Sequence, residues 1–160
     1  MLDPVIEKKM DVIAERIFGT QHDPDQIPIT KESGEKLEKL TSSWVKYRLD
    51  KNGDPISWVI FVPTTKEIAN KFIKGEITER QVLDMTVPQE DYSALYFCAA
   101  VTIPEYRRKG LAIELVKEVI HDIPTTSDYL LFAWPYSKEG RLLIEKLEQV
   151  LERQIYLRSS

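Results

Sequence analysis

The segment from Pro104 to Ala112 combines cationic side chains with a glycine where a helix is expected to begin. It reads PEYRRKGLA, so Arg107, Arg108 and Lys109 directly precede Gly110. The first turn of a helix has backbone N–H groups without an intrahelical acceptor and a partial positive charge, and both favour phosphate oxygens. Glycine allows a ligand close to the backbone, and arginine offers a fork suited to phosphate. The segment predicts a site for a pyrophosphate or a phosphorylated cofactor.

A simpler interpretation is that these charges only solvate the surface. The pattern Arg/Gln-x-x-Gly-x-Gly/Ala would arise by chance in about one in six chains of this length at average composition. The elements expected around the segment strengthen the functional interpretation. Residues 93–103 read SALYFCAAVTI, an apolar run typical of a strand buried on both faces, and residues 111–120 have the spacing of an amphipathic helix. Residues 128–134 predict a second buried strand, which completes a βαβ unit with parallel pairing and a right-handed crossover.

The N-terminal part predicts two helices and a hairpin. Ile6, Met10, Ile13 and Ile17 are spaced as one helical face, and residues 31–41 predict a second helix. Residues 44–49 and 56–62 are rich in β-branched and aromatic side chains and flank an Asn-Gly pair, which favours a hairpin turn. Pro63 is expected to end the second of these strands.

A helical insertion is expected at residues 64–85. Thr64 with Glu67 fits a capping box for a first helix, and Thr78 with Gln81 fits one for a second, shorter helix. Residues 143–151 predict a C-terminal helix, and residues 154–157 a short edge strand. The sequence therefore predicts one domain over residues 1–160 with an α/β (α+β) fold around a mixed sheet, in which residues 1–30 form an N-terminal helix and an irregular loop.

Residues 101–112, VTIPEYRRKGLA, resemble the acyl-CoA signature of the GNAT superfamily of N-acetyltransferases. Arg107, Gly110 and Ala112 match its Gln/Arg-x-x-Gly-x-Gly/Ala loop, and the PEY of residues 104–106 is a frequent lead-in. The signature covers about residues 93–120, and the order of elements agrees from about residue 44 to 151. The resemblance implies a GNAT-like three-layer fold, with a central mixed β-sheet flanked by helices, and acetyl-CoA as co-substrate.

Carried over by position, the resemblance implies three groups of cofactor contacts. Backbone amides at the helix start would hold the CoA pyrophosphate, with Arg107 in the same loop: Arg108, Lys109, Gly110, Leu111 and Ala112, with Ile113 nearby. The main chain of the preceding strand would pair with the pantetheine arm at Val101, Thr102 and Ile103. The end of the next strand would lie near the thioester, at Trp134, Pro135, Tyr136 and Ser137, where Ser137 replaces an asparagine often found there.

The catalytic side chains of the family pattern are missing from this sequence. Where many members have a glutamate base early in the signature strand, this chain has Tyr96. Where many have a tyrosine in the last helix that protonates the leaving thiolate, it has Ile144. Tyr96 and Tyr136 are the substitutes that we consider, although buried tyrosines more often anchor packing through one hydrogen bond. Other members use water instead of a side-chain base.

Composition excludes several classes of protein. The net charge of −4 gives no basic field for nucleic acid, and no apolar run is long enough for a membrane span. A single cysteine, Cys98, excludes a disulfide framework and is expected to be an inert buried thiol. His22 and His121 lack metal-ligand spacing, so no metal is expected. The N-terminal stretch has no signal-peptide core, and we expect a cytoplasmic protein.

Three functions remain open at this stage. The first is an acetyltransferase that acts on a primary amine, either a small molecule or a protein terminus. The second is a non-catalytic module that binds acyl-CoA and reports it to a partner, which the missing acid and base favour. The third is a phosphate-binding α/β domain unrelated to CoA. The sequence also leaves open whether the protein forms a homodimer.

Overall fold

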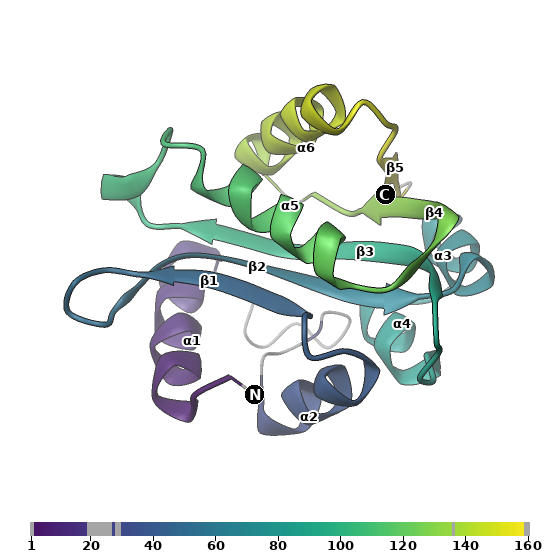
Figure 1. The fold of residues 1–160 in the computed structure, drawn as a ribbon, viewed down its shortest axis with the longest axis horizontal. Helices are drawn as coiled ribbons and strands as arrows, with labels where there is room; N and C mark the ends of the chain where they lie inside the picture. The colour runs from purple at the N-terminus through teal and green to yellow at the C-terminus, as the bar shows by residue number, and fades with distance from the viewer. Residues whose placement is uncertain (1, 19–26, 28–29, 136, 159–160) are drawn as a thin grey trace.

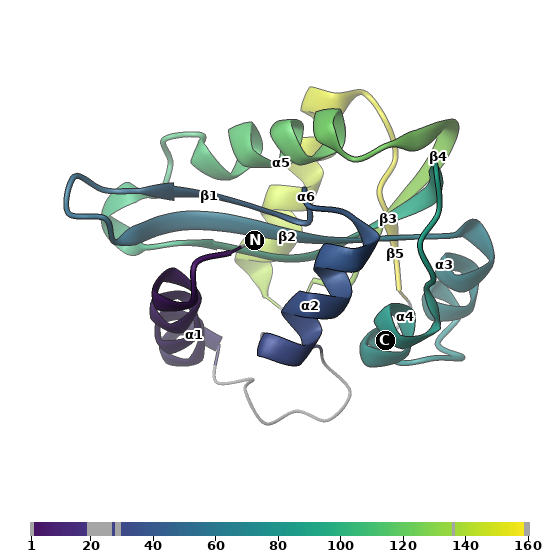
Figure 2. The same cartoon turned by 60° about the horizontal axis from the view of Figure 1, so that its bottom comes forward.

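The computed structural model describes residues 2–18, 27, 30–135 and 137–158. In these residues a sheet separates two layers of helices, as Figures 1 and 2 show. Helices α5 and α6 lie on one side of the sheet, and α1, α2 and α4 lie on the other (Figure 1). The elements in chain order are α1 (Pro4–Phe18), α2 (Lys31–Leu40), β1 (Val45–Leu49), β2 (Pro55–Thr64), α3 (Lys66–Ile73), α4 (Glu79–Met85), β3 (Tyr92–Thr102), the 3₁₀ turn η1 (Pro104–Tyr106), α5 (Leu111–Asp122), β4 (Thr125–Ala133), α6 (Lys138–Leu151) and β5 (Tyr156–Leu157).

The five strands of the described residues form one mixed sheet in the order β1-β2-β3-β4-β5. The pairs β1–β2 and β2–β3 are antiparallel, whereas β3–β4 and β4–β5 are parallel. The predicted hairpin and the predicted parallel βαβ unit are therefore confirmed, and so is the α/β class with a mixed sheet flanked by helices. Helix α5 connects β3 to β4, and α6 connects β4 to β5, because neighbouring parallel strands need a crossover connection.

The side chains at the centre of the sheet are buried on both faces. Trp58, Leu95 and Leu131 come from three neighbouring strands and are at most 2% exposed. Phe72 of α3 packs against the rings of Tyr96 and Phe132, with centroid distances of 5.0 and 5.8 Å. The apolar run that marked β3 in the sequence is thus the centre of the core.

The sequence prediction for the end of β2 is wrong. Pro63 does not end the strand but pairs with Leu95. The N–H of Phe61 donates to the Trp44 carbonyl at 2.8 Å, at the first residues of the β1 edge. The nitrogen of residue 63 points to the same side of β2 as that of residue 61. At Pro63, β1 no longer lies beside β2, so the N–H that proline lacks would have no acceptor there.

The cap of α3 is also one residue later than predicted. The hydroxyl of Thr65, not that of Thr64, accepts from the Ile68 N–H. Thr64 is fully buried, and its hydroxyl is hydrogen-bonded to that of Thr86 at 2.6 Å, which ties the two ends of the α3–α4 insertion together. The predicted capping box of Thr78 and Gln81 at α4 is confirmed. No helix of the described residues is long and apolar enough to cross a membrane.

Candidate functional site

Strand β3 changes its neighbours halfway along its length. From Ala94 to Phe97 it pairs with β2 on one side and with β4 on the other, and the last pair with β4 is Phe97 with Ala133. Among the described residues, the strand partners of residues 99–102 all belong to β2, and Cys98 has no strand partner. We call the β4-facing side of residues 98–102 the open edge. An unpaired strand edge offers N–H and C=O groups to an extended ligand.

A bulge at Cys98 decides which backbone groups reach the open edge. Ile60 pairs with Ala99 and Phe61 with Phe97, so Cys98 is the extra residue on β3. The Ile103 N–H donates to the Ile56 carbonyl of the β2 side at 2.9 Å. Because peptide groups alternate in direction along a strand, Ala99 and Val101 also face β2.

The contacts predicted for the pantetheine arm therefore need a correction. Among Val101, Thr102 and Ile103, only Thr102 presents its N–H and C=O to the open edge. Ala100, which the sequence analysis did not include, presents its own as well. The Thr102 carbonyl accepts from Arg107 Nε at 3.0 Å and keeps a second lone pair, so both its N–H and its C=O can bond to a ligand. The side chain of Val101 is buried, at 4% exposure.

The loop from η1 to α5 has the backbone of an anion site. Arg108 and Gly110 both have positive φ, at 66° and 77°. Gly110 precedes the helix, no side chain of the described residues caps α5, and the Glu114 N–H is the first to bond back to Gly110, at 3.1 Å. The N–H groups of Leu111, Ala112 and Ile113 consequently have no intrahelical acceptor. The predicted loop residues 107–113 thus lie in one continuous turn and helix start.

The cations of this loop differ in what they contact. Arg107 is bonded to the Thr102 carbonyl and ties the loop to the end of β3. Lys109 lies over the ring of Tyr106, with Nζ 5.3 Å from the centroid. No carboxylate of the described residues forms an ion pair with Arg107, Arg108 or Lys109, all of which are exposed. Their charge is therefore available to an anionic ligand.

The two tyrosines considered for catalysis have different outcomes. Tyr96 is fully buried, and its hydroxyl donates to Glu79 Oε2 at 2.5 Å. Tyr136 lies outside the described residues. Ser137, expected beside the cofactor, is the N-cap of α6, and its hydroxyl accepts from the Gly140 N–H at 3.0 Å. Ile144, at the expected place of an acid in the last helix, is buried.

Glu79 is the functional candidate that sequence reasoning missed. It is the first residue of α4 and is 3% exposed, one of few buried charged side chains of the described part of the chain. Its Oε1 accepts from the Ile27 N–H at 2.9 Å, and the Cys98 thiol lies 3.9 Å from the same oxygen. In the sequence, Glu79 is indistinguishable from an ordinary acidic residue in a first helical turn.

Cys98, which the sequence analysis expected to be an inert buried thiol, is half-buried. Burial raises the pKa of the Cys98 thiol well above its ordinary value, and the charge and hydrogen bond of Glu79 raise this pKa further. A thiol that stays protonated is a poor nucleophile. No group of three or more His, Cys, Asp or Glu side chains in the described residues could hold a metal ion. His121 is exposed and contacts Asp122, and His22 lies outside the described residues.

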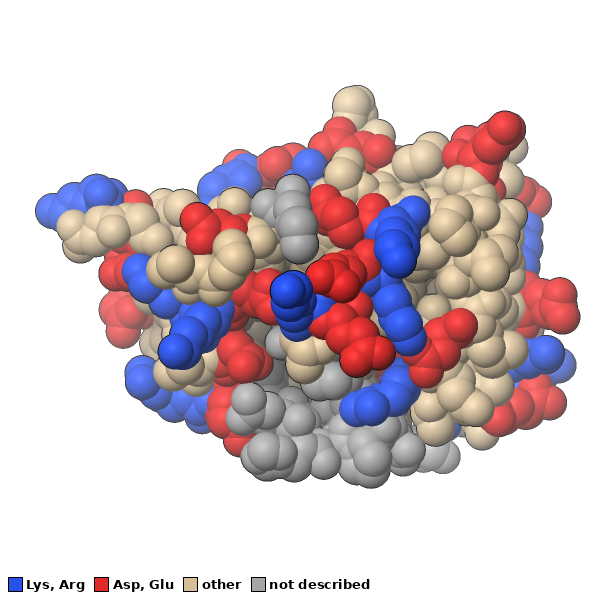
Figure 3. Space-filling view, turned by 90° about the horizontal axis from the view of Figure 1, so that it is seen from below, with Lys and Arg blue, Asp and Glu red and all other residues tan. Residues whose placement is uncertain are grey.

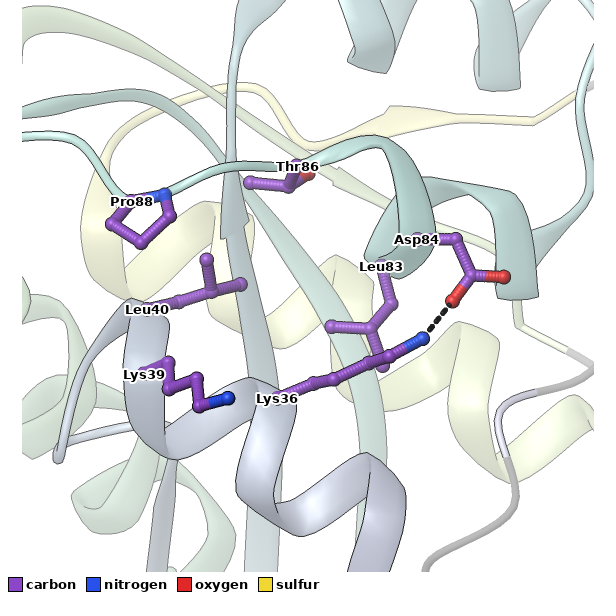
Figure 4. Close-up of a pocket in the computed structure, with 7 residues that line it drawn as sticks. All are labelled: Lys36, Lys39, Leu40, Leu83, Asp84, Thr86 and Pro88. Carbon is purple, nitrogen blue, oxygen red and sulfur yellow. Dashed lines mark hydrogen bonds and ion pairs between the residues drawn. The ribbon is translucent and has the colours of Figure 1, made fainter.

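Two pockets lined by described residues do not include any residue of the open edge. One, with a volume of about 160 Å³, lies between α2 and α4 and is crossed by the ion pair of Lys36 and Asp84 at 2.6 Å (Figure 4). A smaller one of about 30 Å³ lies between α1 and β2, beside Met10 and Trp58. Figure 3 shows the face of α1 and α2, where acidic and basic side chains alternate without a field of one sign.

Comparisons with known proteins add no relative. The sequence matches no known family model and no curated protein.

Proposed function

We propose that this protein is an acyl-CoA-dependent N-acyltransferase with a GNAT-like fold, which transfers an acetyl group from acetyl-CoA to a primary amine. The order of elements supports the proposal. An antiparallel hairpin is followed by a buried strand, a glycine-containing cationic loop, a helix, a parallel strand and a last helix. The motif of Arg107, Gly110 and Ala112 lies at the junction of that strand and that helix.

One observation carries the proposal. The open edge of β3 leads, through η1, to the uncapped first turn of α5. A pantetheine arm has amide groups that suit a strand edge, and a pyrophosphate suits a helix N-terminus. An elongated ligand that carries both groups in that order is CoA, whereas a simple nucleotide would use only the helix start.

The residues that would hold the cofactor follow from this arrangement. The backbone N–H groups of Leu111, Ala112 and Ile113 would bind the pyrophosphate, since they have no intrahelical acceptor. Arg108 and Lys109 would add charge, because no described carboxylate neutralises them. Ala100 and Thr102 would pair with the pantetheine amides. Bound in this way, acetyl-CoA would supply an activated acyl group at the end of β4.

The second candidate is a protein that binds acyl-CoA without catalysis. It is favoured by the burial of Tyr96, whose hydroxyl is bonded to Glu79, and by the apolar Ile144 in the last helix. Neither residue can protonate a departing thiolate. Activity with any amine would exclude this candidate.

A transfer assay with matched glycine variants tests the proposal. The purified protein is incubated with acetyl-CoA and three primary amines (spermidine, lysine methyl ester and phenethylamine), and the release of CoA thiol is followed. We expect transfer to at least one amine and its loss in Gly110→Val. Gly53→Val is the control, because Gly53 has φ of 81° in the distant β1–β2 hairpin. Both variants place a side chain in the left-handed region and are strained alike.

The outcomes separate the three functions. Transfer that Gly53→Val retains and Gly110→Val loses supports the enzyme. Binding of acetyl-CoA without transfer to any amine supports the non-catalytic module. Binding of ADP without binding of CoA contradicts both and leaves a nucleotide or phosphate domain.

A further inference from the structure

The buried carboxylate of Glu79 lies directly beneath the point where β3 loses its partner. The last residue of β3 that pairs with β4 is Phe97, and its two neighbours, Tyr96 and Cys98, both contact the Glu79 carboxylate. Glu79 comes from α4 in the insertion between β2 and β3, so the chain brings an acidic side chain from a separate element to this place. The open edge begins at Cys98, one residue beyond that last pair.

A charged group in such a position needs compensation. Removing a carboxylate from water costs several kcal/mol unless hydrogen bonds replace its hydration. Glu79 accepts from the Tyr96 hydroxyl, from the Ile27 N–H and, more weakly, from the Cys98 thiol. Donors suit the ionised carboxylate, which only accepts hydrogen bonds. These contacts therefore hold Glu79 as the ionised carboxylate, which is the form that can accept a proton.

The proposed reaction requires a proton acceptor. A primary amine is protonated at neutral pH, since amines of the lysine type have pKa values near 10.4. Its nitrogen cannot attack a thioester until one proton has left. Groups with this role are found where buried ionisable side chains meet a cleft or an open edge.

We infer that Glu79 is the general base of this acyltransferase, held in place by Tyr96, an inference that rests on the proposed function. The acceptor ammonium gives one proton to the Glu79 carboxylate. The neutral nitrogen then forms the bond to the thioester carbonyl carbon, and the carbon–sulfur bond breaks. The departing thiolate takes the second proton from the attacking nitrogen, and Glu79 later releases its own proton to solvent. The products are the acetamide and CoA thiol, and no separate acid is needed.

This assignment gives Tyr96 a positioning role in place of a catalytic one. Its hydroxyl donates to Glu79 Oε2 and is itself buried among Phe72 and Phe132. The hydrogen bond stabilises the ionised form of Glu79 and fixes the direction of the carboxylate. Removing the hydroxyl should consequently change the pH dependence of the reaction more than the binding of acetyl-CoA.

The test compares Glu79→Gln with Glu76→Gln on the full chain. Glu76 belongs to the same insertion but is exposed and has no described side-chain contact. With spermidine, lysine methyl ester and phenethylamine as acceptors, we expect Glu79→Gln to lower kcat by about 100-fold or more, the usual loss for a general base. Glu76→Gln should remain within about twofold of the wild type, as a surface substitution does. The affinity for acetyl-CoA, measured by titration calorimetry, should be unchanged in both variants.

Tyr96→Phe provides a second, independent readout. The acidic limb of the pH profile of kcat/KM should move to higher pH, because the carboxylate has lost a donor that favours its ionised form. This measurement keeps the inference testable if Glu79→Gln does not fold. A Tyr96→Phe profile identical to the wild-type profile would overturn the role of the pair.

The failures of the inference and of the proposed function are distinguishable. If acetyl-CoA binds and transfer in Glu79→Gln equals the wild-type rate, the base assignment is overturned and the enzyme stands. If acetyl-CoA binds but no amine accepts, the base assignment is overturned in favour of the non-catalytic module. If acetyl-CoA does not bind, both are overturned.

Discussion

The two halves of β3 have similar residue types and different surroundings. Residues 94–97 pair on both edges, and Ala94, Leu95 and Tyr96 are fully buried. Residues 98–102 continue the same apolar run, but among the described residues 99–102 pair on one edge and the bulged Cys98 on neither; most of the five are half-buried. The difference arises in β4, which ends at Ala133 and leaves the second half without a neighbour. One continuous strand can thus contribute to the core at one end and offer a ligand-binding edge at the other.

Proline substitutions at adjacent positions provide the strongest test of this comparison. Ala99→Pro removes a donor that faces β2 and should destabilise the fold by about 3 kcal/mol or more. Ala100→Pro removes a donor that faces the open edge, where proline is tolerated. We expect urea unfolding to show a large loss for Ala99→Pro and a much smaller one for Ala100→Pro. Equal losses of stability would mean that the Ala100 N–H is hydrogen-bonded within the fold, which contradicts the assignment of the open edge.

The second test separates the charge of the loop from charge elsewhere. Arg108→Ala should weaken acetyl-CoA binding by about tenfold, which corresponds to about 1.4 kcal/mol. The loss should shrink as salt is added, because exposed charges are screened. Arg141→Ala on α6 is the control, since Arg141 is also exposed and has no described ion pair. Titration calorimetry at two salt concentrations checks both variants, and an equal loss in Arg141→Ala would argue for nonspecific attraction.

The smallest expected effect concerns Cys98 at the boundary of the two halves. Burial and the adjacent Glu79 raise the pKa of the Cys98 thiol, so little reactive thiolate is present at pH 8. Alkylation by iodoacetamide should therefore be slower in the native protein than in the urea-unfolded protein. Glu79→Gln removes the negative charge and should increase the native rate a few-fold, whereas Glu76→Gln should not. Native alkylation as fast as that of the unfolded chain would contradict the described environment of Cys98.

The sequence predicted what depends on neighbours along the chain. The Asn-Gly pair marked the β1–β2 hairpin, the apolar run marked β3, and Gly110 marked the start of α5 with its positive φ. Each of these signals acts over a few residues, through turn chemistry or the period of burial. The errors at Pro63 and Thr64 have the opposite origin. A proline is tolerated there because β1 does not extend that far, a fact about a different strand.

The site was predicted only in part for the same reason. The sequence indicated the loop from Arg107 to Ala112, but the bulge at Cys98 shifts the alternation of β3 by one residue. That shift turns the main chain of Val101 and Ile103 towards β2 and gives the open edge to Ala100 and Thr102. Glu79 was missed because its surroundings come from residues distant in the sequence, Tyr96 and Cys98 of β3 and Ile27, which no local pattern encodes.

Thermal unfolding with and without saturating acetyl-CoA tests the central claim most directly. A ligand at 100 times its Kd stabilises the native state by about 2.7 kcal/mol, which raises the Tm by about 5–10 °C for a chain of this size. We predict such a rise for the wild type, a smaller one for Ala100→Pro, and little effect of ADP, which cannot contact the open edge. An unchanged Tm with acetyl-CoA would contradict the account, because the open edge of β3 and the first turn of α5 would then not form a CoA site.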